Sequence, residues 1–338
     1  MEKLKIAIHN SKNGFHPRWI KYCENKNIPF KLVNCHDDDI ISQLEDCSAL
    51  LWHFHHNSVK DSHIARQILF SLEQTGFKVF PDFRTSWHFD DKVGQKYLLE
   101  RLGAPFVPSH VFVNKKEALN WVSTTNYPKV FKLKGGAGSQ NVLLVNSREQ
   151  AKKIVKKAFS SGFSNYNAWG SLKERTRMWR SGKASIFDVI KGIARVVKPP
   201  EFAKGLGVEY GYVYFQDFIP NNDSDTRIIV IDGKAFALKR YVRENDFRAS
   251  GSGFLGFDKK LFNEDCIALA FKLTKGLNAQ CVAYDFIFDS NKQPLLVEIS
   301  YGFSPDAYDV CPGYWDESLR WFEGEFNPQG WIIDSLIK

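Results

Sequence analysis

The sequence predicts an α/β protein whose C-terminal part is α+β. In residues 1–88, short apolar strand patterns alternate with amphipathic helix patterns, which is typical of a parallel sheet covered by helices. From residue 211 onward, longer strand patterns joined by tight turns predict antiparallel hairpins. A chain of 338 residues is too long for one ordinary core, so we expect two or three domains.

The first 88 residues show the alternation element by element. We expect strands at 4–10, 29–35, 49–56 and 78–82, and helices at 17–27, 37–46 and 59–76. Ligands of parallel sheets bind beyond the carboxyl ends of the strands, which here carry polar residues that include His55 and His56. We therefore expect a small Rossmann-like domain in which these histidines have either a substrate role or a plain structural role. The spacing of His and Cys residues does not support a zinc site.

A glycine-rich stretch, "FKLKGGAGSQNVLLV", follows at 131–145. Its lysines precede the glycines, whereas a P-loop has its lysine after them, and Asn141 occupies the third position of a dinucleotide fingerprint. The next helix pattern begins only at Ser147, so the glycines join strand to strand. This order predicts a hairpin with a glycine tip.

Alternation along the first strand of this hairpin places Lys132 and Lys134 on one face and Phe131 and Leu133 on the other. Exposed backbone N–H groups in a glycine loop form a site for anions. A flap with a lysine at its base can therefore close over a polyphosphate.

Positive charge is concentrated in one segment. The net charge of the chain is +8, and residues 171–204 alone contain nine lysines and arginines against three acids. Such a segment attracts nucleotides, nucleic acids, acidic glycans or anionic lipids. Trp169 and Trp179 lie in or beside it, but no recognised nucleic-acid module surrounds them. An anionic partner and a solvated insertion both stay open, and we do not expect nucleic acid.

Two hairpins place charged side chains on one sheet face. Asp232 and Gly233 form a strong two-residue turn signal, which places Asp225 opposite Arg240 and puts Arg227 on the same face. Two guanidinium groups there can bind a phosphoryl group or a carboxylate bidentately. An exposed face of salt bridges is the alternative.

The second hairpin is predicted to turn at residues 290–293. Asp285 then faces Glu298, with Ser300 on the same face. Two adjacent carboxylates either have raised pKa values or need a cation between them, and oxygen ligands of this kind suit Mg²⁺. An ordinary polar sheet face is the alternative.

The order of these features along the chain resembles the ATP-grasp superfamily. The matching parts, between about residues 80 and 303, are Lys92, the lysine and glycine stretch, "YFQDFI", "DTR", "ALKR", "FRASGSG" and "YDF…LVEIS". The resemblance implies an ATP-grasp fold preceded by a small parallel-sheet domain. It implies an N-terminal domain at 1–88, a lid subdomain with a basic insertion at 89–210, and a C-terminal subdomain with an aromatic tail at 211–338.

The resemblance also implies a role for each matching residue. ATP would be held by Lys92, Lys132, Gly135, Gly136, Gly138, Ser139, Gln216, Asp217, Phe218, Ile219 and Asp225, with Glu209 as an alternative near the ribose. The transferred phosphate and the carboxylate would be held by Arg227, Arg240 and Arg248, and Mg²⁺ by Asp285, Glu298 and Ser300. Ser300 stands where members of the family usually have asparagine, and this shorter ligand puts the second metal ion in question. Ser250 also stands where related ligases often have asparagine.

The activity that the resemblance implies is ADP-forming ligation of a carboxylate to an amine, with ATP and Mg²⁺ as cofactors. A non-catalytic, nucleotide-responsive polyanion binder and a small-molecule kinase are the alternatives. The C-terminal tail is similar to uncharacterised ATP-grasp proteins associated with surface-polysaccharide synthesis, so the carboxylate could be glycan-linked. The protein could also form oligomers.

The chain shows no sign of export or of membrane insertion. No apolar run approaches the roughly 18 residues that a membrane span needs, and polar residues come too early for a signal peptide. The six cysteines are scattered without a C-x-x-C spacing, which is typical of reduced thiols. We therefore expect a cytoplasmic protein.

Overall fold

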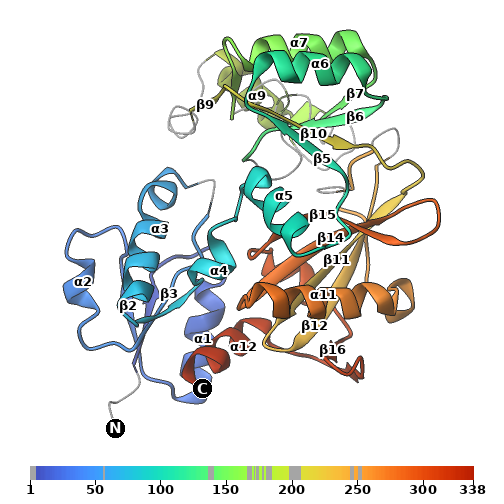
Figure 1. The fold of residues 1–338 in the computed structure, drawn as a ribbon. Coiled ribbons are helices and arrows are strands. Elements are labelled where there is room, and N and C mark those ends of the chain that lie inside the picture. Colours follow the sequence, from blue (N-terminus) through green and yellow to red (C-terminus); the bar gives the residue numbers. More distant parts are fainter. Residues whose placement is uncertain are drawn as a thin grey trace. The chain divides into compact units, whose positions relative to one another are not determined.

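The computed structural model divides the chain into two compact units (Figure 1). The first unit contains Met1–Phe89, Tyr97–Phe106 and Asn221–Lys338, and the second contains Asp90–Lys96 and Val107–Pro220. The structure describes residues 5–55, 58–135, 141–165, 170, 172, 175–176, 179, 185–197, 207–243, 247–249 and 253–338.

The first unit begins with a parallel sheet of four strands in the order β2-β1-β3-β4. The strands are β1 (Ile6–His9), β2 (Phe30–Val33), β3 (Ala49–Leu51) and β4 (Lys78–Phe80). The helices between and after them are α1 (His16–Lys26), α2 (Ile40–Gln43), α3 (Val59–Gln74) and α4 (Phe83–Ser86). Helix α5 (Lys92–Arg101) follows, with its first five residues in the second unit and the rest in the first. The predicted order of strands and helices is confirmed.

A larger antiparallel sheet completes the first unit, in the order β15-β14-β11-β12-β16-β17, with β13 paired to β12. Its strands are β11 (Ser224–Ile231), β12 (Lys234–Tyr241), β13 (Leu255–Gly256), β14 (Cys281–Phe288), β15 (Pro294–Ser300), β16 (Gly313–Asp316) and β17 (Trp321–Glu323). Its helical segments are η1 (Lys259–Leu261), α11 (Glu264–Leu277), η2 (Pro305–Tyr308) and α12 (Pro328–Ile337).

The two faces of this antiparallel sheet belong to different cores. Ile228 and Val230 pack with α11, while Ile229 and Ile231 pack with the N-terminal sheet and α12. These residues alternate between the two cores because successive residues of a strand point to opposite sides of the sheet. The strand residues that continue the second face toward the start of β11 are Arg227 and Asp225.

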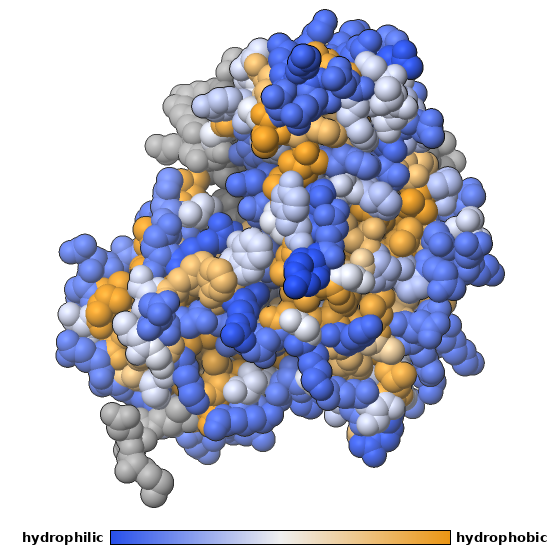
Figure 2. Space-filling model, viewed as in Figure 1, coloured by the Kyte–Doolittle hydropathy of each residue, from blue (hydrophilic) through white to orange (hydrophobic). Residues whose placement is uncertain are grey.

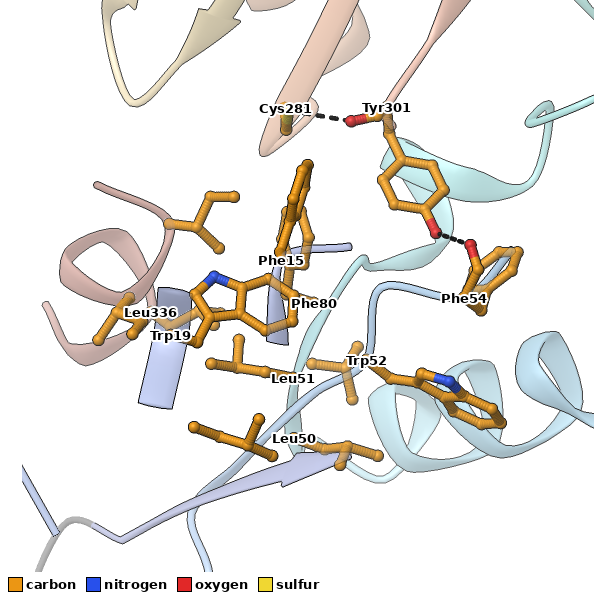
Figure 3. Packing of buried hydrophobic residues seen from close by; sticks show 14 of the residues in the cluster. Phe15, Trp19, Leu50, Leu51, Trp52, Phe54, Phe80, Cys281, Tyr301 and Leu336 are labelled. Atoms are coloured by element: carbon orange, nitrogen blue, oxygen red, sulfur yellow. Dashed lines mark hydrogen bonds between the residues drawn. The ribbon is translucent and has the colours of Figure 1, made fainter. Parts of the chain in front are cut away.

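Figure 3 shows that distant parts of the chain share the core between the N-terminal sheet and the antiparallel sheet. Phe15, Trp19 and Phe80 are fully buried together with Tyr301, which directly follows β15. The Tyr301 hydroxyl donates a hydrogen bond of 2.7 Å to the Phe54 carbonyl. Residues 1–89 and 221–338 therefore form one compact unit, and the predicted boundaries at residues 88/89 and 210/211 stay predictions.

The second unit is built on an antiparallel sheet in the order β5-β10-β6-β7. Its elements are β5 (Ser109–Phe112), α6 (Lys115–Thr124), β6 (Lys129–Lys132), β7 (Leu143–Val145), α7 (Arg148–Ala158), β8 (Phe163–Ser164), α9 (Ile186–Val197), β9 (Val208–Glu209) and β10 (Val213–Asp217). Helices α6 and α7 bury one face of the sheet, which includes Phe131 and Phe215. The opposite face carries Lys132 and Gln216.

The face drawn in Figure 2 is mostly polar outside its grey parts, with apolar patches between hydrophilic side chains. Among the described residues, no helix has both the length and the hydrophobicity that a bilayer crossing requires.

Candidate functional site

The first predicted hairpin is confirmed residue by residue. Ile231 pairs with Lys234 and Asp225 pairs with Arg240 across β11 and β12. Asp232 and Gly233 form the turn with φ angles of 46° and 70°, the left-handed conformation that a two-residue turn of this type needs. The turn therefore sets the register that places Asp225, Arg227 and Arg240 on one face.

These three side chains form a charge network with Asp285 of the neighbouring strand β14. Arg227 donates to both carboxylate oxygens of Asp285, at 2.6 and 2.7 Å. Arg240 does the same to Asp225, at 2.6 and 2.7 Å, and its Nη2 lies 2.8 Å from Asp285 Oδ2. Two positive and two negative groups therefore alternate along the sheet face.

Burial makes this network electrostatically strong. The side chains of Arg240 and Asp285 are 9% and 6% exposed. Burial alone would raise the pKa of Asp285, but Arg227 and Arg240 outweigh it and hold this pKa well below its usual range. Of the two predicted alternatives, a raised pKa is wrong for Asp285, because the guanidinium groups of Arg227 and Arg240 neutralise the carboxylate, and a cation beside it stays a prediction. For Asp225, burial has the largest effect and raises the pKa to about 6, against the charge of Arg240.

The second hairpin has the predicted pair but not the predicted turn. Phe288 pairs with Pro294, so the loop is one residue longer than expected and begins at Asp289. The Asp289 carboxylate accepts hydrogen bonds of 2.8 Å from the N–H groups of Asn291 and Gln293, which stabilise the longer loop. A register shift between Asp285 and Phe286 then restores the predicted pairing of Asp285 with Glu298.

The predicted metal ligands have the chemistry that Mg²⁺ prefers, but Asp285 and Ser300 already have other partners. Asp285 and Glu298 face each other, and Mg²⁺ prefers a few carboxylate oxygens completed by water and phosphate oxygens. The Asp285 carboxylate already contacts two guanidinium groups, so a cation would compete with them. The Ser300 hydroxyl donates to the Gly302 carbonyl at 3.1 Å, and a metal ion would need to replace this bond. Among the described residues, no three His, Cys, Asp or Glu side chains gather as a metal site.

The lysine and glycine hairpin of the second unit is also confirmed. β6 and β7 pair antiparallel, with Phe131 opposite Leu143. Lys132 is 7% exposed, and its Nζ donates a hydrogen bond of 2.6 Å to Gln216 Oε1 on β10. The predictions for Gly136, Gly138 and Ser139 fall outside the described residues.

The base of the flap lies beside the start of α5. The Lys92 N–H donates a hydrogen bond of 2.9 Å to the Lys134 carbonyl, and Lys92 itself is 8% exposed. The two lysines that the resemblance assigns to phosphate, Lys92 and Lys132, are therefore both buried and both belong to the second unit. Their role stays a prediction.

Glu209 takes a position at the flap that the sequence did not predict. Its carboxylate accepts hydrogen bonds from the N–H groups of Lys134, at 3.1 Å, and Gly135, at 3.4 Å. The Tyr212 hydroxyl donates to the same carboxylate and accepts from the Lys134 N–H at 2.6 Å. A carboxylate therefore occupies backbone donors that suit an anion. Glu209 also pairs with Phe163 across β9 and β8, a pairing that local sequence patterns do not show.

The residues that the resemblance assigns to the adenine of ATP, Gln216 to Ile219, begin within β10 and continue past its end. Gln216 is 3% exposed, and the Asp217 carboxylate accepts a bond of 2.6 Å from Lys129. Phe218 and Ile219 continue from the strand to Pro220, where the second unit ends. Adenine binding by Gln216, Asp217, Phe218 and Ile219 stays a prediction.

Arg248 is the third predicted arginine, and it lies beside the ring of Phe247. Its guanidinium carbon lies 6.0 Å from the centre of the Phe247 ring. Ser250 falls outside the described residues. A catalytic role for Arg248 stays a prediction.

Five histidines gather at the carboxyl edge of the N-terminal sheet. His9, His16 and His53 are at most 6% exposed, and the ring centres of His9 and His36 lie 5.1 Å apart. His55 joins them through a ring contact of 4.6 Å with His53. The sequence analysis did not single out His9 and His16, although their places at the end of β1 and the start of α1 were a usable signal.

Most of these histidines are neutral at neutral pH. Burial is the largest effect on His9 and His16 and lowers both pKa values to about 4. His55 Nε2 is buried and has no hydrogen-bond partner among the described residues. His53 Nε2 would lie 3.0 Å from a Cβ atom placed on Gly302, so the cluster adjoins the end of β15. His56 falls outside the described residues.

The comparisons with known proteins agree with this architecture. Residues 207–306 match the family model of the RimK-like ATP-grasp domain. A RimK domain ATP-grasp protein from Sphaerobacter thermophilus has 14% sequence identity and a TM-score of 0.57, with 99% of this chain and 100% of that chain covered. A search of curated proteins finds no match.

Two further solved structures are similar in fold. The biotin carboxylase domain of the Hydrogenobacter thermophilus 2-oxoglutarate carboxylase, in complex with MgADP, ADP and bicarbonate, has 14% identity and a TM-score of 0.59 over 98% of this chain and 69% of that chain. D-alanine–D-alanine ligase from Bacillus anthracis has 13% identity and a TM-score of 0.53 over 99% and 96%. The predicted ATP-grasp fold, preceded by a small parallel-sheet domain, is confirmed.

Proposed function

We propose that this ATP-grasp protein is an ADP-forming ligase that joins a carboxylate to an amine. The observation that carries the proposal is the charged sheet face of Arg227, Arg240, Asp285 and Glu298. It lies within residues 207–306, the part that matches the RimK-like ATP-grasp model. ATP-grasp enzymes use ATP with Mg²⁺, and a face with two guanidinium groups and two carboxylates suits a metal-bound phosphate chain.

The reaction has two steps in this proposal. A carboxylate oxygen of the substrate attacks the γ-phosphorus of ATP, and ADP leaves. The amine then attacks the carbonyl carbon of the acyl phosphate, loses a proton and expels phosphate, which leaves an amide. The protein forms no covalent bond, so it acts by orientation and by neutralising charge.

The first unit would supply the groups that hold transferring charge. Asp285 and Glu298 would hold Mg²⁺, which neutralises phosphate oxygens when bound. The competition for Asp285 has a consequence for the arginines. Arg227 and Arg240 now donate to Asp285, and if this carboxylate were shared with Mg²⁺ their N–H groups would be available to the transferred phosphate and the substrate carboxylate.

The second unit would hold the nucleotide. Lys92 and Lys132 would contact phosphates, Gln216 to Ile219 would bind the adenine, and the glycine flap would cover the phosphate chain. Glu209 would need to release the N–H groups of Lys134 and Gly135 for that closure. An N-terminal domain at 1–88, a lid subdomain at 89–210 and a C-terminal subdomain at 211–338 are part of this proposal.

The proposal is tested by release of ADP from ATP and Mg²⁺ with panels of carboxylates and amines, beginning with amino acids and uronic acids. A ligase releases ADP only when its substrates are present, and mass spectrometry then detects an amide. A stable phosphorylated product without an amine would instead assign the protein as a kinase.

One observation favours a second candidate, a nucleotide-responsive protein that binds a polyanion without catalysis. The Ser300 hydroxyl, which stands where a metal ligand is expected, bonds to the backbone of Gly302. Nucleotide binding without ADP release, across substrate panels that include anionic glycans, would favour this candidate over a ligase.

A further inference from the structure

Helix α9 exposes a stripe of large apolar side chains in the described structure. Ile186, Phe187, Ile190 and Ile193 are 43%, 69%, 53% and 53% exposed. Their spacing puts all four within one side of a helix of 3.6 residues per turn. Most large apolar side chains of the protein are buried in its cores, so four exposed ones on a helix of 12 residues need an explanation.

The other side of α9 is packed against the protein. A Cβ atom on Gly192 would lie 2.9 Å from Leu172 and 3.0 Å from Arg175, which shows how closely these side chains approach the helix. Val189 is 9% exposed. The part of the protein that packs against α9 therefore buries Val189 but leaves the four apolar side chains of the stripe exposed.

The helix also carries its own N-terminal cap. The Phe187 N–H donates to Ser185 Oγ at 3.0 Å, and the Ser185 N–H donates to Asp188 Oδ2 at 3.2 Å. This reciprocal pair is a capping box. Asp188 is the only acid of α9, and its carboxylate also lies 3.9 Å from Arg175, so the helix presents Lys191 without a competing acid on the exposed side.

The part of the sequence that contains α9 is strongly positive. Residues 107–220 contain nineteen lysines and arginines and seven acids, whereas the whole chain has a net charge of only +8. The rest of the chain is therefore acidic on balance, and the positive charge belongs to the segment that carries α9. Within it, residues 171–204 contain nine lysines and arginines and three acids.

We propose that α9 is an interfacial helix that docks the protein on the surface of an anionic phospholipid bilayer. Helices of this class place an apolar stripe at the boundary of the headgroups and the acyl chains, while nearby lysines and arginines attract anionic headgroups. Helix α9 carries the apolar stripe together with Lys191 and Arg195, and the stretch of sequence that contains it, residues 171–204, carries the excess of positive charge.

The two parts together favour a lipid surface over other partners. An acidic glycan or a nucleic acid would use the positive charge but would gain nothing from three exposed isoleucines. A second copy of this chain would cover the apolar stripe but would bring two strongly positive segments together, which costs free energy. The docking does not depend on the ligase proposal, because it uses no residue assigned to nucleotide or metal.

The test is flotation of the full chain with phosphatidylcholine vesicles that contain or lack phosphatidylglycerol, at low and high salt. The Phe187→Glu/Ile190→Glu variant removes apolar area and adds two charges on α9. The matched control, Val113→Glu/Leu143→Glu, makes the same change at two exposed apolar residues of the second unit outside α9, which are 77% and 45% exposed. Circular dichroism and the melting temperature show whether both variants fold.

We expect the wild-type protein to bind only the vesicles with phosphatidylglycerol, and less strongly at high salt. The α9 variant should lose about tenfold or more of its vesicle partitioning, while the control stays within about twofold of wild type. A Phe187→Gln/Ile190→Gln variant, which adds no charge, should also lose binding and serves if the glutamate variant does not fold.

Three results would overturn the proposal. The first is no binding of the wild type to phosphatidylglycerol vesicles. The second is an equal loss in the α9 variant and the control, which would mean that only the total charge matters. The third is a wild-type dimer that the α9 variant converts to a monomer without any vesicle binding, which would assign the stripe to a second copy of the chain.

Discussion

Arg227 and Asp285 face each other on the adjacent strands β11 and β14 and share two parallel hydrogen bonds of 2.6 and 2.7 Å. In this bidentate pair Asp285 is buried and Arg227 is partly buried, and Arg240 adds a third contact to the same carboxylate. We expect the pair to stabilise the sheet. It also positions guanidinium groups that we propose bind the substrate.

The first prediction concerns this pair. Asp285→Asn removes the buried negative charge and leaves the partly buried Arg227 without its partner, which should lower the free energy of unfolding by about 3 kcal/mol. Urea denaturation measures the change. Asp225→Asn is the matched control, because Arg240 keeps its contact with Asp285 in that variant and the loss should be smaller. Equal stability of the Asp285→Asn variant and wild type would mean that Asp285 is not the carboxylate that stabilises Arg227 in the sheet.

The second prediction concerns the flap lysine. Lys132→Met keeps most of the buried volume of the side chain but removes its charge, so ADP release should fall about 100-fold or more if Lys132 neutralises phosphate charge. Gln216 loses one hydrogen bond, and the melting temperature should change by only a few degrees. Lys129→Met is the control, because Lys129 pairs with Asp217 on the same strands. Similar losses in both variants would remove the special role of Lys132.

The third prediction separates the metal from the nucleotide. Glu298→Gln should raise the Mg²⁺ concentration needed for half-maximal stabilisation by ADP, because an amide is a weaker ligand for Mg²⁺ than a carboxylate. The measurement is a Mg²⁺ titration of the melting temperature at fixed ADP. Glu298 would lose its assignment if the two proteins gave the same titration curve.

The fourth prediction concerns the histidine cluster and pH. The folded protein holds His9 and His16 with pKa values of about 4, below the usual histidine pKa of 6.5, so the unfolded chain binds more protons between these values. Their contribution to stability is complete above pH 6.5 and is lost as the pH falls toward 4. Between about pH 7 and 5, the free energy of unfolding should decrease by about 2 kcal/mol or more from this pair.

A His9→Asn variant isolates this effect from the carboxylates that also titrate in acid. Asparagine can accept the hydrogen bond that the Cys35 N–H donates to His9 Nδ1. The pH dependence of the variant should be shallower by about one proton near pH 5.5. An unchanged slope would mean that His9 is not kept neutral by the fold.

Local patterns predicted the parts of the site that depend on one turn. The Asp232 and Gly233 turn sets the register of its own hairpin, so the pairing of Asp225 with Arg240 followed directly. The pairing of Asp285 with Glu298 was also correct, but for an incomplete reason. The longer loop moved the register by one residue, and a bulge moved it back.

Contacts between segments that are distant in sequence could not be predicted in this way. The partner of Arg227 was not predicted because β11 and β14 are neighbours only in the folded sheet. The contact of Glu209 with Gly135 joins residues 74 positions apart, and local patterns carry no information on such pairs. The packing of Tyr301 in the N-terminal core could not be predicted for the same reason.

The most direct test of the central claim is the melting temperature of the protein with ADP, ATP or GTP, each with and without Mg²⁺. A ligand that binds only the folded state stabilises it by about 2.7 kcal/mol at 100 times its dissociation constant, which raises the melting temperature by several degrees. The account predicts this rise for adenine nucleotides with Mg²⁺ and a smaller one for GTP or without the metal. No rise with any nucleotide at millimolar concentration would contradict the account, because the ATP-grasp fold of this chain would then have no nucleotide site.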